Sequence, residues 1–267
     1  MILASASSSH LVLVLATALT YAISSMGALR LGQRLAQGVF WLAWLLHALV
    51  LYQGLLGAVP HFGFAPVLSV TAWLVAAVYA IEVQIYPGLQ ARWPLAALSA
   101  LAVLLALVFP GSPLHASASP WLALHWALGV ASYGLFGAAV VHAWWMSRAS
   151  ARMRSGVGNA EGLPLLTMER LTFRLVGTGF VLLTATLLVG LLFGNALYGV
   201  AAGLMWSHKT VFSVLSWLTF AVLLVGRARW GWRGRHAVRI LYAGVGLLLL
   251  AYVGSRFVLE VVLGRTV

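Results

Sequence analysis

The sequence has 267 residues, of which 63% are hydrophobic and only 7% are charged, and its mean hydropathy is +1.00. Soluble globular domains carry about 25% charged residues, so this composition excludes a water-soluble protein and favours one that lies in a lipid bilayer. The chain has no cysteine, no aspartate and a single lysine, which excludes a CxxC redox pair, a cysteine zinc site, covalent c-type haem attachment and a P-loop.

The apolar runs are continuous rather than alternating, which favours transmembrane helices over a β-barrel. A span needs about 20 apolar residues, and the chain has room for about eight. We therefore predict an all-α, polytopic membrane bundle of about eight helices, with prolines between the spans or at their ends. The predicted spans cover residues 10–29, 37–58, 66–86, 93–109, 121–146, 175–195, 209–226 and 237–259.

Two further segments bear on this division. The first span has no basic stretch before it, so we expect a retained helix rather than a cleaved signal peptide. Residues 162–174 mix apolar and charged side chains before the sixth span. They fit either a short helix lying in the membrane interface or an ordinary charged lead-in to that span.

The cationic residues orient the predicted bundle. All but three of the 16 lysine and arginine residues follow the first, third, fifth or seventh span; the exceptions are Lys209, Arg256 and Arg265. By the positive-inside rule, both termini then face outward (N-out/C-out). This topology also explains the net charge of +12, so we expect membrane lipid and no nucleic acid as a partner.

Two histidines fall at matched depth near the predicted outer face, His125 in span five and His208 at the start of span seven. Two neutral imidazoles can ligate haem iron, while Lys209 and Arg256 can pair with the propionates. The available aromatic wall comprises Trp121, Trp126, Tyr133, Trp206 and Trp217. The alternatives are a solvated His208, a His125 that only hydrogen-bonds a neighbouring helix, and an Arg256 that pairs with Glu260 four residues on.

Three other ionisable residues lie within the predicted spans: His47, Glu82 and His142. They could line a polar path through a small-molecule permease, which is one alternative function. His47 is more simply interpreted as a hydrogen-bonded histidine of the bundle. A second alternative, an accessory subunit of a larger membrane complex without haem, places no demand on the histidines.

Several spaced motifs resemble the cytochrome c assembly proteins, a haem-handling, CcsA/CcmC-like family of membrane proteins. Leu124–Tyr133 is similar to that family's histidine helix, in which a tyrosine follows the histidine by eight positions. Further segments follow in the family's order, so that the resemblance covers residues 66–264. They are Glu169–Phe180 with Leu183 and Thr184, then Trp206–Lys209, Trp217, Gly231–Arg235 and Tyr252–Gly254.

Two departures point to the short, YpjD-like branch. The family's tryptophan-rich outer signature is reduced to Trp206–Lys209, and Arg256–Glu260 stands where a second family histidine is expected. The resemblance implies a non-enzymatic protein of the bacterial inner membrane that binds haem non-covalently and takes part in cytochrome c-type biogenesis with other assembly components.

The resemblance also implies a division of the chain into a transmembrane hairpin, residues 1–65, and a cytochrome c assembly-like domain, residues 66–264. We expect haem at the outer side, with His125 and His208 as the iron ligands. His208 as a substitute for the missing histidine is our own interpretation. Lys209, Arg256, Trp206 and Tyr133 complete the expected cofactor site.

Overall fold

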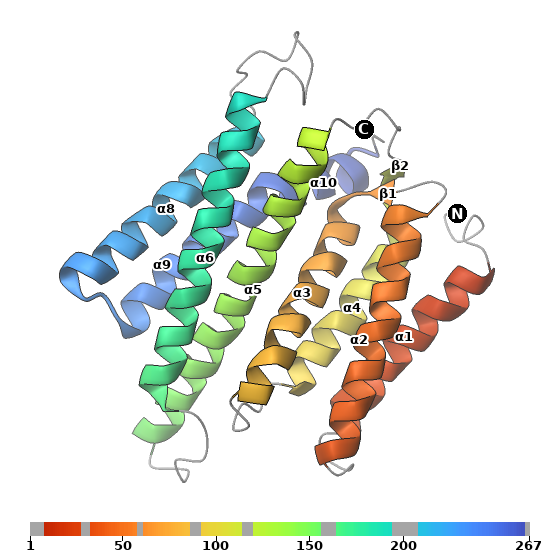
Figure 1. The fold of residues 1–267 in the computed structure, drawn as a ribbon, viewed down its shortest axis with the longest axis horizontal. Helices are drawn as coiled ribbons and strands as arrows, with labels where there is room; N and C mark the ends of the chain where they lie inside the picture. The colour runs from red at the N-terminus through yellow and green to blue at the C-terminus, as the bar shows by residue number, and fades with distance from the viewer. Residues whose placement is uncertain are drawn as a thin grey trace. The chain divides into compact units, whose positions relative to one another are not determined.

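The computed structural model of the chain describes residues 8–27, 33–57, 61–85, 92–113, 120–155, 164–193 and 208–264, which are helical nearly throughout (Figure 1). Within these ranges, seven helices are long and apolar enough to cross a membrane, and Pro94–Val108 forms a shorter apolar helix. The predicted all-α, multi-span membrane bundle is therefore confirmed.

The chain divides into two compact units. Unit 1 comprises Met1–Ile85, Gln90–His115 and Arg256–Val267, and unit 2 comprises Tyr86–Leu89 and Ala116–Ser255. These units follow packing contacts, so the expected division into residues 1–65 and 66–264 stays a prediction.

Besides the helical end of the chain after Arg256, the described part of unit 1 contains four helices, in which α1 packs against both α2 and α4 while α4 also packs against α3. Their bounds are α1 (Ser8–Gly27), α2 (Gln33–Leu56), α3 (Phe64–Ile85) and α4 (Arg92–Val108). Apolar side chains such as Leu19, Leu45 and Leu98 remain exposed on these helices. In a bilayer, lipid would cover them.

A two-residue strand pair shows how α3 and α4 run. Strand β1 (His61–Phe62) precedes α3, strand β2 (Ser112–Pro113) follows α4, and the two pair antiparallel. The chain must therefore travel along α3 and return along α4 to the same end of unit 1. Although α4 has only 17 residues, about 26 Å at 1.5 Å per residue, it thus serves as the return span.

A buried polar network joins all four helices of unit 1. His47 of α2 is fully buried and hydrogen-bonds the Tyr21 hydroxyl through Nδ1 at 3.2 Å and the Ser69 hydroxyl through Nε2 at 2.9 Å. Ser99 of α4 hydrogen-bonds the same Tyr21 side chain. Because apolar burial does not drive helices together in lipid, such bonds help select which helices pack. His47 is therefore a hydrogen-bonded histidine of the bundle.

Two tryptophans make a second tie between α2 and α3. The indole N–H of Trp44 donates to the Trp73 carbonyl at 3.2 Å, and that of Trp73 donates to the Trp44 carbonyl at 3.1 Å. Their rings stack with centroids 4.7 Å apart. The reciprocal bonds fix the register of the two helices while satisfying both indole donors.

We expect His47→Leu to lower the free energy of unfolding of the detergent-solubilised protein by about 1–3 kcal/mol, because the Tyr21 and Ser69 hydroxyls lose a buried partner. Tyr52→Phe, on the exposed side of α2, is the matched control and should change it by less than about 0.5 kcal/mol. Denaturant titration followed by circular dichroism measures both. Equal stability of the two variants would show that the network does not hold unit 1 together.

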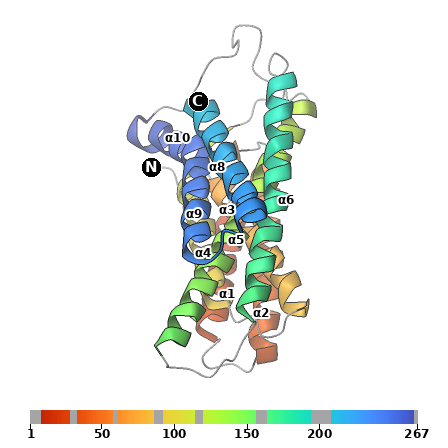
Figure 2. The same cartoon turned by 90° about the vertical axis from the view of Figure 1, so that its left-hand side faces the viewer.

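In the described part of unit 2, four helices form a ring, in which α5 packs against α6, α6 against α8, α8 against α9 and α9 against α5. Figure 2 shows α8 and α9 running side by side as a hairpin. Their bounds are α5 (Pro120–Arg154), α6 (Leu165–Leu192), α8 (His208–Trp230) and α9 (Gly234–Leu249). The core centres on Phe136 and Phe220, whose rings stack 3.9 Å apart.

Helices α5 and α6 are longer than the predicted spans. Helix α5 continues to Arg154 rather than ending at residue 146, and α6 begins at Leu165 rather than at residue 175. At 35 residues α5 is about 52 Å long, well beyond the roughly 30 Å of a bilayer's hydrocarbon. A separate interfacial helix over residues 162–174 is wrong, since the part from Leu165 onward is the start of α6.

The last helix changes its hydrogen-bonding register along its length. After α9 the chain forms the π-helical segment η2 (Leu250–Gly254), the short α10 (Ser255–Phe257) and the π-helical segment η3 (Val258–Val262). A π segment replaces i+4 hydrogen bonds by i+5 bonds and leaves a carbonyl at the junction in need of another donor.

Candidate functional site

The candidate site is built around His125, which lies in the second turn of α5 and is half-buried. Its Nδ1 is 3.1 Å from the backbone carbonyl oxygen of Thr186 on α6. A carbonyl can only accept a hydrogen bond, so Nδ1 must carry the proton. In the neutral ring, Nε2 then keeps its lone pair and is the nitrogen able to bind a metal.

A glycine of α6 lies beside the His125 ring. A Cβ atom at Gly190 would lie 3.3 Å from Cε1 of His125, so a glycine lets the imidazole lie close to the α6 backbone. One turn before His125 on α5, the indole of Trp121 stacks on Phe193 with centroids 3.8 Å apart and planes within 7°. This seam between α5 and α6 thus combines one imidazole with a flat aromatic surface.

Within the described part of the chain, no hydrogen bond reaches Nε2 of His125. Metal-binding histidines typically donate their other ring N–H to a carbonyl or carboxylate, which fixes the tautomer and raises the basicity of the ligating nitrogen. His125 has this arrangement. No group of three or more His or Glu side chains that could hold a metal occurs among the described residues.

The other predicted iron ligand, His208, is the first residue of α8 and is exposed, and Lys209 beside it is half-buried. Helix α8 lies across the ring from α5, since each of them packs mainly against α6 and α9. No described contact joins His125 and His208, so their pairing stays a prediction. Trp206 lies outside the described residues.

Arg256 belongs to unit 1, whereas His125, His208 and Lys209 belong to unit 2. Its guanidinium lies 3.9 Å from the carboxylate of Glu260, four residues on. Glu260 in turn accepts a hydrogen bond from the backbone N–H of Phe64 at the start of α3, and the Phe257 ring packs edge-on against Phe64. In the structure Arg256 is thus paired with Glu260, as the spacing of four residues along the sequence suggested.

Tyr133 is used in packing unit 2. Its hydroxyl donates a hydrogen bond to the Leu248 carbonyl oxygen, just before α9 passes into η2. The bond supplies a donor near the change of register and ties α5, which carries His125, to the last helix. The expected contact of Tyr133 with a cofactor stays a prediction.

Other motif residues also meet in pairs. The indole N–H of Trp217 on α8 donates to the Thr184 hydroxyl on α6 at 2.8 Å, and the Trp217 ring stacks on Phe180. The Thr184 hydroxyl itself donates to the Phe180 carbonyl. These contacts hold α6 and α8 in register, so the motifs include residues that set the position of the helix bearing Thr186, the partner of His125.

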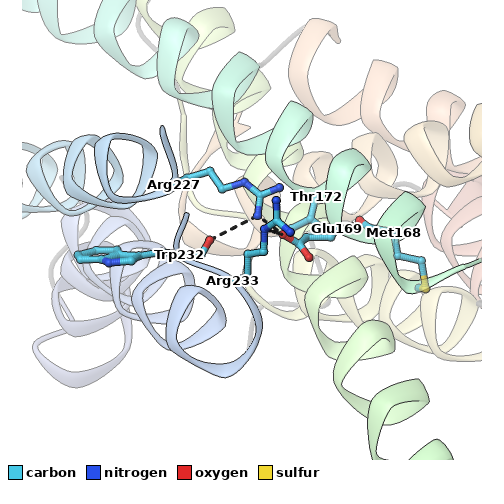
Figure 3. Close-up of polar contacts among 6 residues, drawn as sticks. All are labelled: Met168, Glu169, Thr172, Arg227, Trp232 and Arg233. Carbon is cyan, nitrogen blue, oxygen red and sulfur yellow. Dashed lines mark hydrogen bonds and ion pairs between the residues drawn. The ribbon is translucent and has the colours of Figure 1, made fainter. Parts of the chain in front are cut away.

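The end of unit 2 distant from His125 holds an ion-pair cluster (Figure 3). Glu169 is buried, with only 8% of its surface exposed. Its carboxylate accepts a hydrogen bond from Arg227, with which it forms an ion pair, and it lies 3.7 Å from Nε of Arg233. Arg227 also donates to the Trp232 carbonyl at 3.4 Å and lies over the ring of Phe173. Figure 3 shows both guanidinium groups directed at the carboxylate while the Trp232 indole points away.

Sequence reasoning missed this cluster because it assigned the arginines to topology alone. A usable signal was present, since the acidic Glu169 and the basic Arg233 stand in two separate family-like motifs, Glu169–Phe180 and Gly231–Arg235. Of the residues of the alternative polar path, His47 and Glu82 belong to unit 1 and His142 belongs to unit 2. A permease path through them stays a prediction.

We expect Glu169→Gln to destabilise the protein by about 1–3 kcal/mol, because two arginines lose their shared, mostly buried counter-charge. Arg229→Gln is the control, because Arg229 is exposed and lies in the same last turn of α8 as Arg227. It should lower the free energy of unfolding by less than about 0.5 kcal/mol. Thermal unfolding in detergent measures both. A Glu169→Gln variant as stable as the control would show that the cluster contributes nothing to the packing of α6 against α8 and α9.

The chain is similar to a known protein family and to several individual proteins. The family described as cytochrome C assembly protein matches residues 34–263. The inner membrane protein YpjD of Escherichia coli (strain K12) is 33% identical over 150 residues, which are 55% of this chain and 56% of YpjD. The cytochrome c biogenesis protein CcsA of Synechococcus sp. (strain JA-3-3Ab) is 30% identical over 103 residues, 36% of this chain and 29% of CcsA.

The first of these relatives are matched over only part of their length. An Azospirillum brasilense protein of 28.8 kDa is 35% identical over 147 residues, 54% of each chain. The chain thus spans a little over half the length of YpjD and of this protein, and less than a third of CcsA. No solved structure matches the chain.

Proposed function

Because the chain belongs to the cytochrome c assembly protein family, we propose that it is a haem-handling membrane protein of cytochrome c biogenesis. The observation that carries this proposal is the imidazole of His125, held by the Thr186 carbonyl with Nε2 as its lone-pair nitrogen. We propose the bacterial inner membrane as its location, as for the relative YpjD, whose name describes it as an inner membrane protein.

The residues at the seam of α5 and α6 fit a haem. Haem, when bound, would supply an iron that takes nitrogen ligands, an apolar macrocycle and two propionate carboxylates. His125 offers the iron ligand, the Thr186 carbonyl sets its tautomer, and Gly190 leaves room for the ring. The stacked Trp121 and Phe193 offer an apolar aromatic surface one turn away.

The remaining parts of the site are proposed from the sequence. His208 would be the second iron ligand, and Lys209 would pair with a propionate. Arg256, which the sequence suggested for the other propionate, belongs to unit 1 and pairs with Glu260. Trp206 and Tyr133 would add to the aromatic wall, although the Tyr133 hydroxyl is already committed to Leu248. We propose binding and presentation of haem to other cytochrome c assembly components, with no reaction catalysed by this chain.

We expect the purified protein, with haem added, to show a Soret band that His125→Ala abolishes or shifts, because the iron loses its preset ligand. His208→Ala should change the band in the same direction. His236→Ala is the matched control, since His236 is an exposed histidine of unit 2 on α9, at the end that holds Glu169, and it should leave the spectrum unchanged.

A cavity variant separates loss of the ligand from loss of the fold. His125→Gly should lose the wild-type haem spectrum and regain it when free imidazole is supplied, because imidazole replaces the missing ring. A Soret band unaltered by both His125→Ala and His208→Ala would refute histidine ligation at this site. An absent band in the wild-type protein would refute haem binding altogether.

We expect Gly190→Ala to weaken haem binding by about 10-fold or more, because the added methyl group displaces the His125 ring from its hydrogen bond to Thr186. Gly177→Ala is the matched control: it lies on the same helix and its added Cβ would meet nothing within 4 Å. Haem titration followed by absorption measures both affinities. Equal affinities would show that α6 does not position His125.

A further inference from the structure

The turn between α8 and α9 is a rigid, basic loop at the end of two spans. The Trp232 ring occupies the space where a Cβ at Gly226 would lie, and its backbone N–H donates to the Gly226 carbonyl at 3.2 Å. Gly231 and Gly234 adopt positive φ angles of 65° and 59°, which close the turn tightly. Helices His208–Trp230 and Gly234–Val262 both have the length and hydropathy of membrane spans, so the turn lies at a membrane surface.

We call residues 227–239, which join the end of α8 to the start of α9, the basic turn; three of its arginines face outward. Arg229, Arg235 and Arg239 are exposed, and no acidic side chain in the described part of the chain lies within ion-pair distance of them. Arg227 differs, because it turns inward to Glu169. The turn therefore carries an excess of positive charge that no described acidic side chain neutralises.

An exposed tryptophan accompanies this charge. Trp230 is 68% exposed and its ring stacks against Trp232, 5.7 Å away between centroids. Trp232 is held in turn against Gly226, so Trp230 stands on a fixed support. Tryptophan side chains concentrate at the level of lipid headgroups, where the apolar ring and the indole N–H both find suitable surroundings.

We propose that the basic turn binds the headgroup of an anionic phospholipid, with Arg229, Arg235 and Arg239 contacting the phosphodiester and Trp230 inserting beside it. A guanidinium group can offer two parallel N–H donors to phosphate oxygens, which a mobile counterion cannot do. Membrane topology alone requires only positive charge somewhere on this side of the bilayer. A preset turn with an adjoining tryptophan is suited to hold one lipid in place.

The test is native mass spectrometry of the full-length protein in mild detergent, titrated with phosphatidylglycerol or phosphatidylcholine. The wild type should retain phosphatidylglycerol in preference to phosphatidylcholine. The variant R229Q/R235Q/R239Q should bind phosphatidylglycerol at least 10-fold more weakly, since each arginine near an anionic surface contributes on the order of 5-fold. Trp230→Ala should also weaken retention although it changes no charge.

The matched control is R148Q/R152Q/R154Q, which removes the same charge from the end of α5 and should keep the wild-type preference. Circular dichroism and the melting temperature verify that each variant is folded. Equal loss in the two triple variants would overturn the proposal in favour of unspecific charge attraction. Full competition by millimolar inorganic phosphate, or no preference by the wild type, would also overturn it.

Discussion

The hydrocarbon core of a membrane contains no water, so each polar group within it must find a partner in the protein. Helices meet this demand for the backbone, and a small number of side-chain contacts meet it for the rest. His47 does so in unit 1 by bonding to Tyr21 and Ser69. In unit 2, Tyr133 bonds to the Leu248 carbonyl and Trp217 to Thr184. These bonds select helix partners where apolar burial cannot.

His125 meets the same demand in a different way. One ring nitrogen bonds to a backbone carbonyl of the neighbouring helix, and the other is not used within the described part of the chain. Helix α6 supplies both the carbonyl, at Thr186, and the space, at Gly190. A contact that serves packing thereby also presets a ligand nitrogen. Membership of the cytochrome c assembly protein family makes haem the group for which we propose this nitrogen is held.

Hydropathy predicted the eight spans because bilayer thickness sets the length of each apolar run. It did not predict that α5 and α6 extend beyond the predicted spans, since a helix outside a bilayer needs no apolar run. The partner of His125 is a backbone carbonyl, which has no signature in the sequence. The Glu169 cluster joins residues 58 positions apart, Glu169 and Arg227, and required the fold to be seen.

The state of the His125 ring before any ligand binds shows whether its Nε2 is ready to bind iron. Nitrogen-15 NMR of haem-free protein labelled at histidine, with the His125 signals assigned by their loss in His125→Gln, reports which ring nitrogen carries the proton. We expect a neutral ring protonated at Nδ1 with a lone pair on Nε2. A ring protonated at Nε2 alone would contradict it, because the nitrogen proposed to bind iron would then be blocked and the bond to Thr186 absent.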